Sequence, residues 1–390
     1  MTAEGVFDLV GKNLKLDTKE DIAPYLSELE KVEPLTEIHL GGNTLGVGAC
    51  QALAEVLKTK SSLKVADFAD IFTGRLITEI PDALRALCDA LVDHEHLEEV
   101  NLSDNAFGGR SAEPMVNLLT NNHHICVLKL SNNGLGVTGG TIVADALYEA
   151  AQKLKAKGEA SQLRTVICGR NRLENGSAPA WARAFKAHGN LVEVRMYQNG
   201  IRMEGVSEIC KGLSHCKNLE VLDLQDNTAT FRGSRAVANA LPHWKHLRVL
   251  NLSDCLLKSK GGMLLFERLH EGHNKKLEAL HIQYCDLNRD ALHKLGHAIE
   301  LHLSELSCLE INGNFAEEDD ESVKKILASL EKWGNSDALD ELDDMDPEGE
   351  EDEDDDEEDE EQDEEGDEGE KPDAQADELA DELARTHISS

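Results

Sequence analysis

The sequence is poor in aromatic and basic residues, and each shortage excludes a class of protein. Only 4% of the 390 residues are aromatic while 40% are hydrophobic, so a core built from this chain must be mainly aliphatic. Lys and Arg number 39 against 76 Asp and Glu, and the resulting net charge of −37 makes nucleic acid a poor partner. No apolar run reaches the length of a membrane span, and the opening MTAEGVFDLVGKN lacks the basic and apolar regions of a secretory signal. We therefore expect a cytoplasmic protein that binds neither membrane nor nucleic acid.

Motifs of independent catalysis are also missing. The chain has no phosphate-binding P-loop, no dinucleotide-binding glycine motif, no zinc-protease motif and no nucleophile elbow. His293 and His297 have the i, i+4 spacing of metal ligands on a helix, but no further ligand is anchored beside them. A solvated helix face is favoured there, and we expect no metal site. The nine cysteines are odd in number and show no paired spacing, which favours reduced structural thiols over a disulfide framework.

What the chain does have is a repeating leucine pattern. In residues 219–227, LEVLDLQDN, the spacing L-x-x-L-x-L-x-x-N places alternate leucines on the inner face of a short strand and an asparagine at the turn that follows. The same frame begins at positions 35, 63, 97, 125, 163, 191, 219, 247, 277 and 306. Five of the nine steps are 28 residues long, which fits one strand and one helix. We predict an α/β leucine-rich-repeat solenoid crescent, with parallel β-strands on the concave side and α-helices on the convex side.

This frame divides the chain into three segments. Residues 1–34 are predicted to be an N-terminal capping repeat, with a helix that begins after Thr18. Residues 35–335 are the leucine-rich-repeat domain of about ten repeats. Residues 336–390 are predicted to be a disordered acidic tail, because from position 337 onward the chain has 30 acidic residues and only two basic ones, Lys371 and Arg385. Near its end, Leu379 and Leu383 are spaced i, i+4 in a segment that could fold on a partner.

Two repeats are longer than the others. The repeat that begins at residue 63 carries six extra residues between strand and helix, in FTGRLITEIPD, where Pro81 is well placed to open the helix. The repeat that begins at residue 125 carries ten extra residues at the opposite edge, in a lengthened helix that Gly158 would end. Insertions on the strand-to-helix edge, or rim, are the ones that solenoids use for binding.

A column of residues stands at this rim, one just before each turn position. The rim column comprises Gly42, Asp70, Asp104, Asn132, Arg170, Gln198, Asp226, Asp254, Tyr284 and Gly313. For most of these side chains the simpler interpretation is a solvated edge that keeps the protein soluble. Arg170 and Arg172, however, interrupt an otherwise acidic or small rim beside the repeat of Asn132. We assign these three residues, with Arg75 of the inserted loop, to a surface that binds a partner.

Several segments resemble the yeast-type Ran GTPase-activating proteins. They are FADIFTGR (68–75), LSDNAFG (102–108), LSNNGLG (130–136), CGRNRLENG (168–176), YQNGIR (197–202) and LDLQDNT (222–228), and the tail segments ELDDMD (341–346) and ADELADEL (376–383). The resemblance covers essentially the whole chain, and generic leucine-rich repeats do not share CGRNRLENG. Ile77 departs from the family pattern, which has a second basic residue near Arg75.

The resemblance implies a cytosolic GTPase-activating protein that binds Ran-GTP through the rim and favours a steep Ran-GTP difference across the nuclear envelope. It implies that Asn132, rather than an arginine finger, orders the catalytic glutamine of Ran. The residues that it assigns to partner binding and positioning are Arg75, Arg170, Arg172, Asp226, Asn133, Gln198 and Asp104. GTP and Mg²⁺ would be carried by Ran, so no cofactor of its own is expected. We expect a monomer, with a Ran-binding co-activator protein as a further possible partner.

The alternative is a leucine-rich-repeat protein that binds without activating. Ribonuclease-inhibitor-like crescents share the repeat length, and acidic histone-chaperone-like leucine-rich proteins share the tail. The first class is expected to be richer in cysteine, and the second has shorter repeats in a smaller solenoid. Neither accounts for LSNNGLG together with CGRNRLENG.

Overall fold

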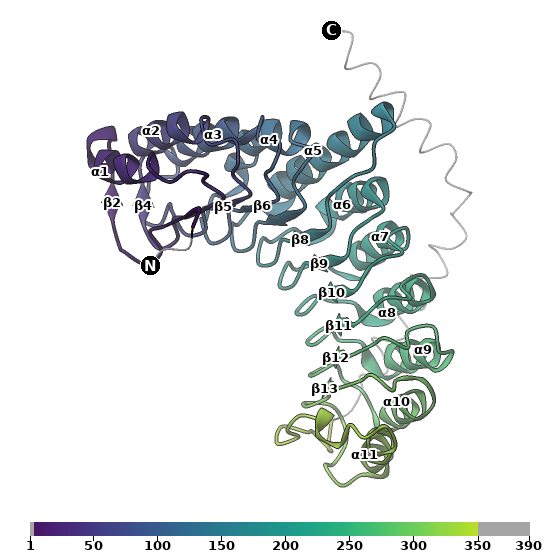
Figure 1. The fold of residues 1–390 in the computed structure, drawn as a ribbon. Coiled ribbons are helices and arrows are strands. Elements are labelled where there is room, and N and C mark those ends of the chain that lie inside the picture. Colours follow the sequence, from purple (N-terminus) through teal and green to yellow (C-terminus); the bar gives the residue numbers. More distant parts are fainter. Residues whose placement is uncertain (1–3, 350–390) are drawn as a thin grey trace. The chain divides into compact units, whose positions relative to one another are not determined.

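Short parallel strands, one from each repeat, form an 11-stranded sheet within residues 4–349, the part of the chain that the computed structural model describes (Figure 1). They lie in the sheet in chain order, so each strand pairs with the strands of the preceding and following repeats. The strands are β1 (Val6–Asp8), β3 (Glu37–His39), β5 (Val65–Asp67), β6 (Glu99–Asn101), β7 (Val127–Lys129), β8 (Thr165–Ile167), β9 (Glu193–Arg195), β10 (Val221–Asp223), β11 (Val249–Asn251), β12 (Ala279–His281) and β13 (Cys308–Glu310). A second sheet pairs β2 (Lys15–Leu16) with β4 (Thr44–Leu45).

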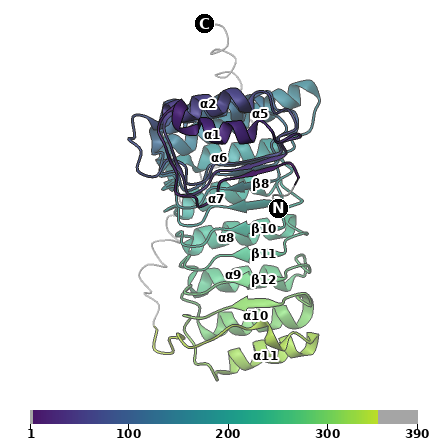
Figure 2. The same ribbon diagram turned by 60° about the vertical axis from the view of Figure 1, so that its left-hand side comes forward.

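The helices form a second layer behind this sheet. They are α1 (Lys19–Leu29), α2 (Val47–Leu57), α3 (Ile80–Leu91), α4 (Val116–Asn121), α5 (Gly136–Lys157), α6 (Glu174–His188), α7 (Met203–Leu213), α8 (Thr230–Ala240), α9 (Lys258–His270), α10 (Arg289–His302) and α11 (Glu321–Trp333). Strands line the inner side of the curved stack and helices its outer side (Figure 1), and Figure 2 shows the repeats following one another in chain order. The predicted α/β leucine-rich-repeat solenoid is confirmed.

The repeat frame folds this way because its leucines and asparagines have separate tasks. Leu222 and Leu224 are at most 1% exposed, between the sheet and the helices. Burying each such side chain contributes about 1.5–3 kcal/mol. The Asn227 amide donates to Met196 O at 3.0 Å and to Leu224 O at 2.7 Å, so it joins two repeats at a turn whose carbonyls would otherwise be unpaired. A cysteine at the same repeat position also bonds to the preceding repeat, since the Cys255 thiol donates to Leu224 O at 3.2 Å.

The N-terminal segment is a repeat in its own right. Strand β1 pairs in register with β3, so Phe7 lies opposite Ile38 and extends the sheet. Thr18 caps α1, and the Asp21 side chain accepts from the backbone N–H of Thr18 in return, which forms a capping box. The predicted helix start at Thr18 is therefore confirmed.

Both insertions lie where the sequence places them. The loop between β5 and α3 carries the first, and Pro81 stands in the first turn of α3. The second lengthens α5 to 22 residues, and Gly158 ends that helix in the left-handed conformation at φ 72°. An alanine at that φ would be strained, so glycine is the suitable residue there.

The C-terminal boundary differs from the prediction of a tail that begins at residue 336. Residues 336–349, here called the strap, lie along the last repeat. Leu339 bridges to Leu309 in parallel, and Leu342 and Met345 pack against the core. The Tyr284 hydroxyl donates to the Asp344 carboxylate at 2.8 Å. Apolar residues inside the acidic run therefore cover the edge of β13 that no further repeat covers. The remainder of the predicted tail, with Leu379 and Leu383, lies outside the described residues.

All nine cysteines fall within residues 4–349 and each is a free thiol, as predicted. None of the helices in residues 4–349 is long and apolar enough to cross a membrane.

Candidate functional site at the rim

The rim column has one backbone conformation throughout. Its φ values lie between 48° at Asp70 and 74° at Gly42, which is the left-handed region. Glycine tolerates that region freely and asparagine or aspartate tolerate it better than other residues, whereas most L-residues lose roughly 1–2 kcal/mol there. Arg170, at φ 56°, is thus costlier to the fold than a glycine would be. Such a residue is better explained by what its side chain does than by stability.

Backbone hydrogen bonds hold the column in place. The backbone N–H of Asn132 donates to Gly169 O at 2.9 Å, and that of Arg170 donates to Tyr197 O at 2.9 Å. The same bond recurs from repeat to repeat, so the ladder of the sheet continues into the rim. Side chains mounted on this ladder are held at fixed spacing before any partner arrives, since neighbouring parallel strands lie about 4.8 Å apart.

Asn132 is exposed and has one oriented contact. Its Nδ2 donates to the Asp104 carboxylate, one repeat earlier in the column, at 2.9 Å. A carboxylate only accepts hydrogen bonds, so this contact settles which end of the amide faces Asp104. Within residues 4–349 the amide oxygen of Asn132 has no hydrogen-bond partner, and it is left to accept from another molecule.

The residues that follow Asn132 along the rim, in the column and just after it, change the charge of this edge. Arg170 and Arg172 are both exposed, and neither forms an ion pair with any residue of the described range. Gln198 donates its amide to the Asp226 carboxylate at 2.9 Å. The rim therefore presents an oriented amide, two cations and a fixed amide–carboxylate pair in succession.

Between Gln198 and Tyr284 the rim is hollowed and acidic. Gln198, Asp226, Asp254, Leu256 and Tyr284 line this hollow. Burial, followed by the neighbouring Asp226 carboxylate, raises the pKa of Asp254. A cationic side chain placed there would relieve that repulsion while its stem covers Leu256, which is 42% exposed.

Arg75 does not project from the inserted loop. Its side chain is 10% exposed and reaches back to the first two repeats. The guanidinium donates to the Thr44 hydroxyl and to Thr44 O, each at 2.8 Å, and it is paired with Asp17. The hydrogen bond that Asp17 accepts from Arg75 is the main reason that the pKa of Asp17 is lowered. Arg75 therefore positions the loop, and its contact with a partner stays a prediction.

Asn133 does not fit the partner-binding role expected of it. Its side chain is fully buried. The amide donates to Leu102 O and Leu130 O, each at 2.9 Å, and its oxygen accepts from the backbone of Asn105 at 2.9 Å. As the turn asparagine of its repeat, Asn133 supports the rim from beneath and is out of reach of a docked protein.

One contact beside Asn132 was not anticipated from the sequence. The ring of Tyr197 lies so close to Gly169 that a Cβ on the glycine would come within 2.4 Å of it. The Tyr197 hydroxyl bonds to Ser131 Oγ at 3.2 Å, and that oxygen also accepts from the backbone N–H of Gly169 at 3.2 Å. The ring thus ties together three repeats next to Asn132. A glycine followed by a tyrosine one repeat later was the available signal.

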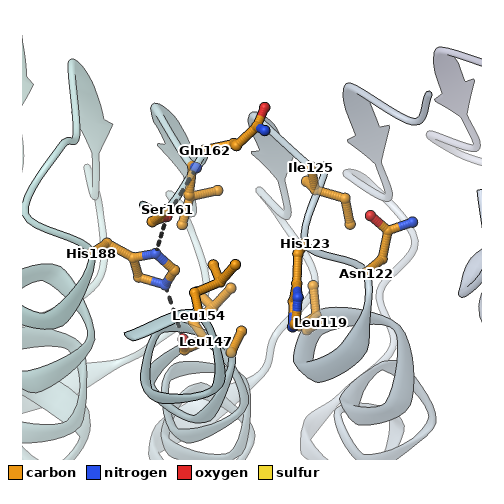
Figure 3. A pocket seen from close by; sticks show the side chains of 11 residues that line it. Leu119, Asn122, His123, Ile125, Leu147, Leu154, Ser161, Gln162 and His188 are labelled. Carbon is orange, nitrogen blue, oxygen red and sulfur yellow. Dashed lines mark hydrogen bonds between the residues drawn. The ribbon is translucent and has the colours of Figure 1, made fainter. Parts of the chain in front are cut away.

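A second hollow lies at the opposite, helix-to-strand edge, beside α5 (Figure 3). Its walls are mainly apolar, with Leu119, Ile125 and Leu147 among them. His188 lines one side; Leu147 O accepts from its Nε2 at 2.9 Å, and the Ser161 hydroxyl donates to its Nδ1 at 2.6 Å. These two partners suit a neutral imidazole, and burial lowers the pKa of His188 to about 4. The contacts are those of a structural histidine.

Comparisons with known proteins agree with the repeat architecture. A family model described as "Leucine Rich repeat" matches residues 93–116 and 244–266. Ran GTPase-activating protein 1 of Saccharomyces cerevisiae is 42% identical over 337 residues, which are 84% of this chain and 83% of the yeast protein. Ran GTPase-activating protein 1 of Xenopus laevis is 42% identical over 331 residues, but these are only 57% of the frog protein. The ribonuclease inhibitor of Sus scrofa is 26% identical over 280 residues, 69% of this chain and 58% of the inhibitor.

Proposed function

This chain belongs to the Ran GTPase-activating protein family, and from that membership we propose that it stimulates GTP hydrolysis by Ran, acting through the rim column. GTP hydrolysis by such a GTPase is limited by the orientation of the attacking water and by charge in the transition state. An activator therefore needs a small number of groups held in fixed positions, and it needs no catalytic machinery of its own. GTP and Mg²⁺ belong to Ran in this proposal.

The observation that carries the proposal is the orientation of Asn132. Asp104 holds the amide nitrogen, so the amide oxygen faces outward as an acceptor. The side chain of a glutamine offers N–H donors that this oxygen can accept. Asn132 would then hold the catalytic glutamine of Ran, and that glutamine would orient the water. Because the column is already fixed by backbone bonds, little reorganisation is required when the transition state forms.

The placement of the arginines supports an asparagine-based mechanism over an arginine finger. Arg75, the arginine on the inserted loop, is engaged with Asp17 and Thr44 rather than extended. Arg170 and Arg172 are exposed beside Asn132 and suit the docking of an acidic surface. Asp226 suits the docking of a basic one. Positive and negative segments on one rim give the partner a single orientation.

The rival function is binding without activation, to which the relationship with ribonuclease inhibitor lends some support. Such a protein would occupy Ran-GTP and leave its hydrolysis rate unchanged. It gives no reason for an exposed amide with a fixed orientation beside two unpaired cations. The cytoplasmic location, the monomeric state, the absence of a cofactor and a role for a co-activator stay predictions.

The deciding experiment is single-turnover hydrolysis of GTP on Ran with substoichiometric amounts of this protein. Activation in trans predicts that one molecule turns over many molecules of Ran-GTP, with a rate that saturates as Ran is raised. A stoichiometric complex without acceleration would reject the proposal and leave the binding function.

A further inference from the structure

Three side chains of metal-ligand type meet on the concave face at the C-terminal end of the sheet. His281 on β12 lies opposite Glu310 on β13, and Cys308 stands two residues before Glu310 on the same strand. Their ligand atoms all lie within 4.8 Å of one another. His281 Nδ1 is 2.8 Å from a carboxylate oxygen of Glu310. Their strand neighbours, Leu280 before His281 and Leu309 between Cys308 and Glu310, are fully buried, so the three ligand side chains share the opposite, concave face.

The strap brings a carboxylate, a candidate fourth donor, to this face. Leu339 pairs with Leu309, and the backbone N–H of Asp340 donates to Leu309 O at 3.0 Å. Alternation along the strap puts Asp340 next to Glu310. The surroundings are anionic: burial first, and then the carboxylates of Glu310 and Asp340, raise the pKa of the Cys308 thiol.

We propose that His281, Cys308 and Glu310 bind one Zn²⁺ ion, with Asp340 or water as the fourth ligand. Calcium and magnesium prefer oxygen ligands throughout, whereas an imidazole with a thiolate and a carboxylate suits the borderline zinc ion. Bond lengths of about 2.0–2.3 Å require His281 and Glu310 to separate by a fraction of an ångström and the Cys308 sulfur to move inward. Zinc displaces the thiol proton, which passes to solvent, so binding weakens as pH falls.

The other end of the sheet provides a contrast. His39 lies between two carboxylates, with Nδ1 3.3 Å from Asp67 and Nε2 3.1 Å from Glu37. Both ring nitrogens are thus engaged on opposite sides, and no thiol joins them in a group of three ligands within residues 4–349. The C-terminal cluster differs because its donors converge on one point. Sequence spacing concealed it, since the ligands are 27 and 29 residues apart and meet only through the register of the repeats.

Zinc at this place would join β12 and β13, and through Asp340 it would join them to the strap. An ion that binds the folded chain alone stabilises it according to its concentration relative to its dissociation constant. Thermal unfolding of the full chain should therefore shift upward with added zinc. The site is remote in the sheet from Asn132, so its occupancy is separable from GTPase activation.

The test uses Co²⁺ as a spectroscopic substitute on the full chain after treatment with a chelator. We expect one tightly bound cobalt ion, a thiolate-to-cobalt charge-transfer band in the near ultraviolet, and loss of that band when zinc is added. Cys308→Ser should abolish the band and the thermal shift. Cys126→Ser is the matched control, because Cys126 is another half-buried thiol beside a strand. Glu310→Gln should keep the band but weaken cobalt binding roughly tenfold or more.

Weak binding of cations by the many acidic residues gives no thiolate band, so it is distinguished from the proposed site. The absence of a band in the unmutated chain would overturn the proposal. A band that persists in Cys308→Ser, or that disappears in Cys126→Ser, would overturn it as well. Circular dichroism of each variant ensures that the comparison is made between folded proteins.

Discussion

The Asn132 amide nitrogen donates a 2.9 Å hydrogen bond to the Asp104 carboxylate, one repeat before it in the rim column. The bond joins two exposed side chains whose backbones are both left-handed, at φ 58° and 62°. It follows that the Asn132 side chain has a set orientation before any partner binds.

Asn132→Ala should abolish most of the acceleration while Ran-GTP binding stays nearly intact. In the proposed mechanism the amide acts on a group that matters chiefly in the transition state, so we expect a loss of ~10²–10³ in the saturated rate, as for removal of one oxyanion-hole donor. Single-turnover hydrolysis at increasing activator concentration measures the rate and the half-saturation point separately. Weakened binding with an unchanged saturated rate would refute the assignment.

Asp104→Ala should reduce the saturated rate by a smaller factor, about tenfold. It removes a hydrogen bond to a charged group, and 1.4 kcal/mol of lost orientation corresponds to a factor of ten. Since Asp104 acts through Asn132, the double variant should be no slower than Asn132→Ala alone. Independent, multiplicative losses in the double variant would show that Asp104 contacts Ran directly.

The periodic leucines made the architecture predictable, because burial of one strand face is enforced at every repeat. The rim column was predictable too, since it stands at a fixed offset from the turn asparagine. The contacts of long side chains could not be predicted in this way. Nothing in the sequence pattern indicates that Arg75 folds back to Asp17 or that Tyr197 contacts Ser131. Asn133 was misassigned to binding because its family motif does not distinguish the exposed asparagine from the buried one beside it.

Arg75→Ala should raise the activator concentration required for half-saturation more than it lowers the saturated rate. The guanidinium fixes the inserted loop through Asp17 and Thr44, so its loss should disorder a docking element. Asp17→Ala is the matched variant, because it breaks the same pair and retains the cation. If Asp17→Ala reproduces the effect, Arg75 acts as a positioning residue. A collapse of the saturated rate with binding retained would restore the arginine-finger mechanism.

Two truncations should differ sharply in stability. Ending the chain after Gly349 keeps the strap and should leave the thermal unfolding temperature nearly unchanged, because the removed run is densely like-charged. Ending it after Asn335 removes the packing of Leu339 and Leu342. Part of their burial is lost and the edge of β13 is exposed, so the free energy of unfolding should fall by about 2–4 kcal/mol. Calorimetry of the two truncated proteins measures their unfolding temperatures. Equal temperatures would show that the strap contributes no stability.

The buried imidazole of His188 should make stability fall in mild acid. Its pKa in the folded chain is lowered to about 4, mainly by burial, whereas an unfolded histidine titrates near 6.5. The unfolded state therefore takes up a proton first as pH falls. The contribution of His188 is complete above about pH 6.5 and is lost progressively down to about pH 4, amounting to about 3 kcal/mol.

His188→Gln should flatten this part of the pH profile while lowering stability at neutral pH, because glutamine cannot match both Leu147 O and the Ser161 hydroxyl. His215→Gln is the control, since His215 is exposed. Denaturant unfolding between pH 7 and pH 4 measures the slope for each protein. A profile for His188→Gln as steep as that of the unmutated chain would mean that other groups carry the acid sensitivity, and that the imidazole is protonated without unfolding its surroundings.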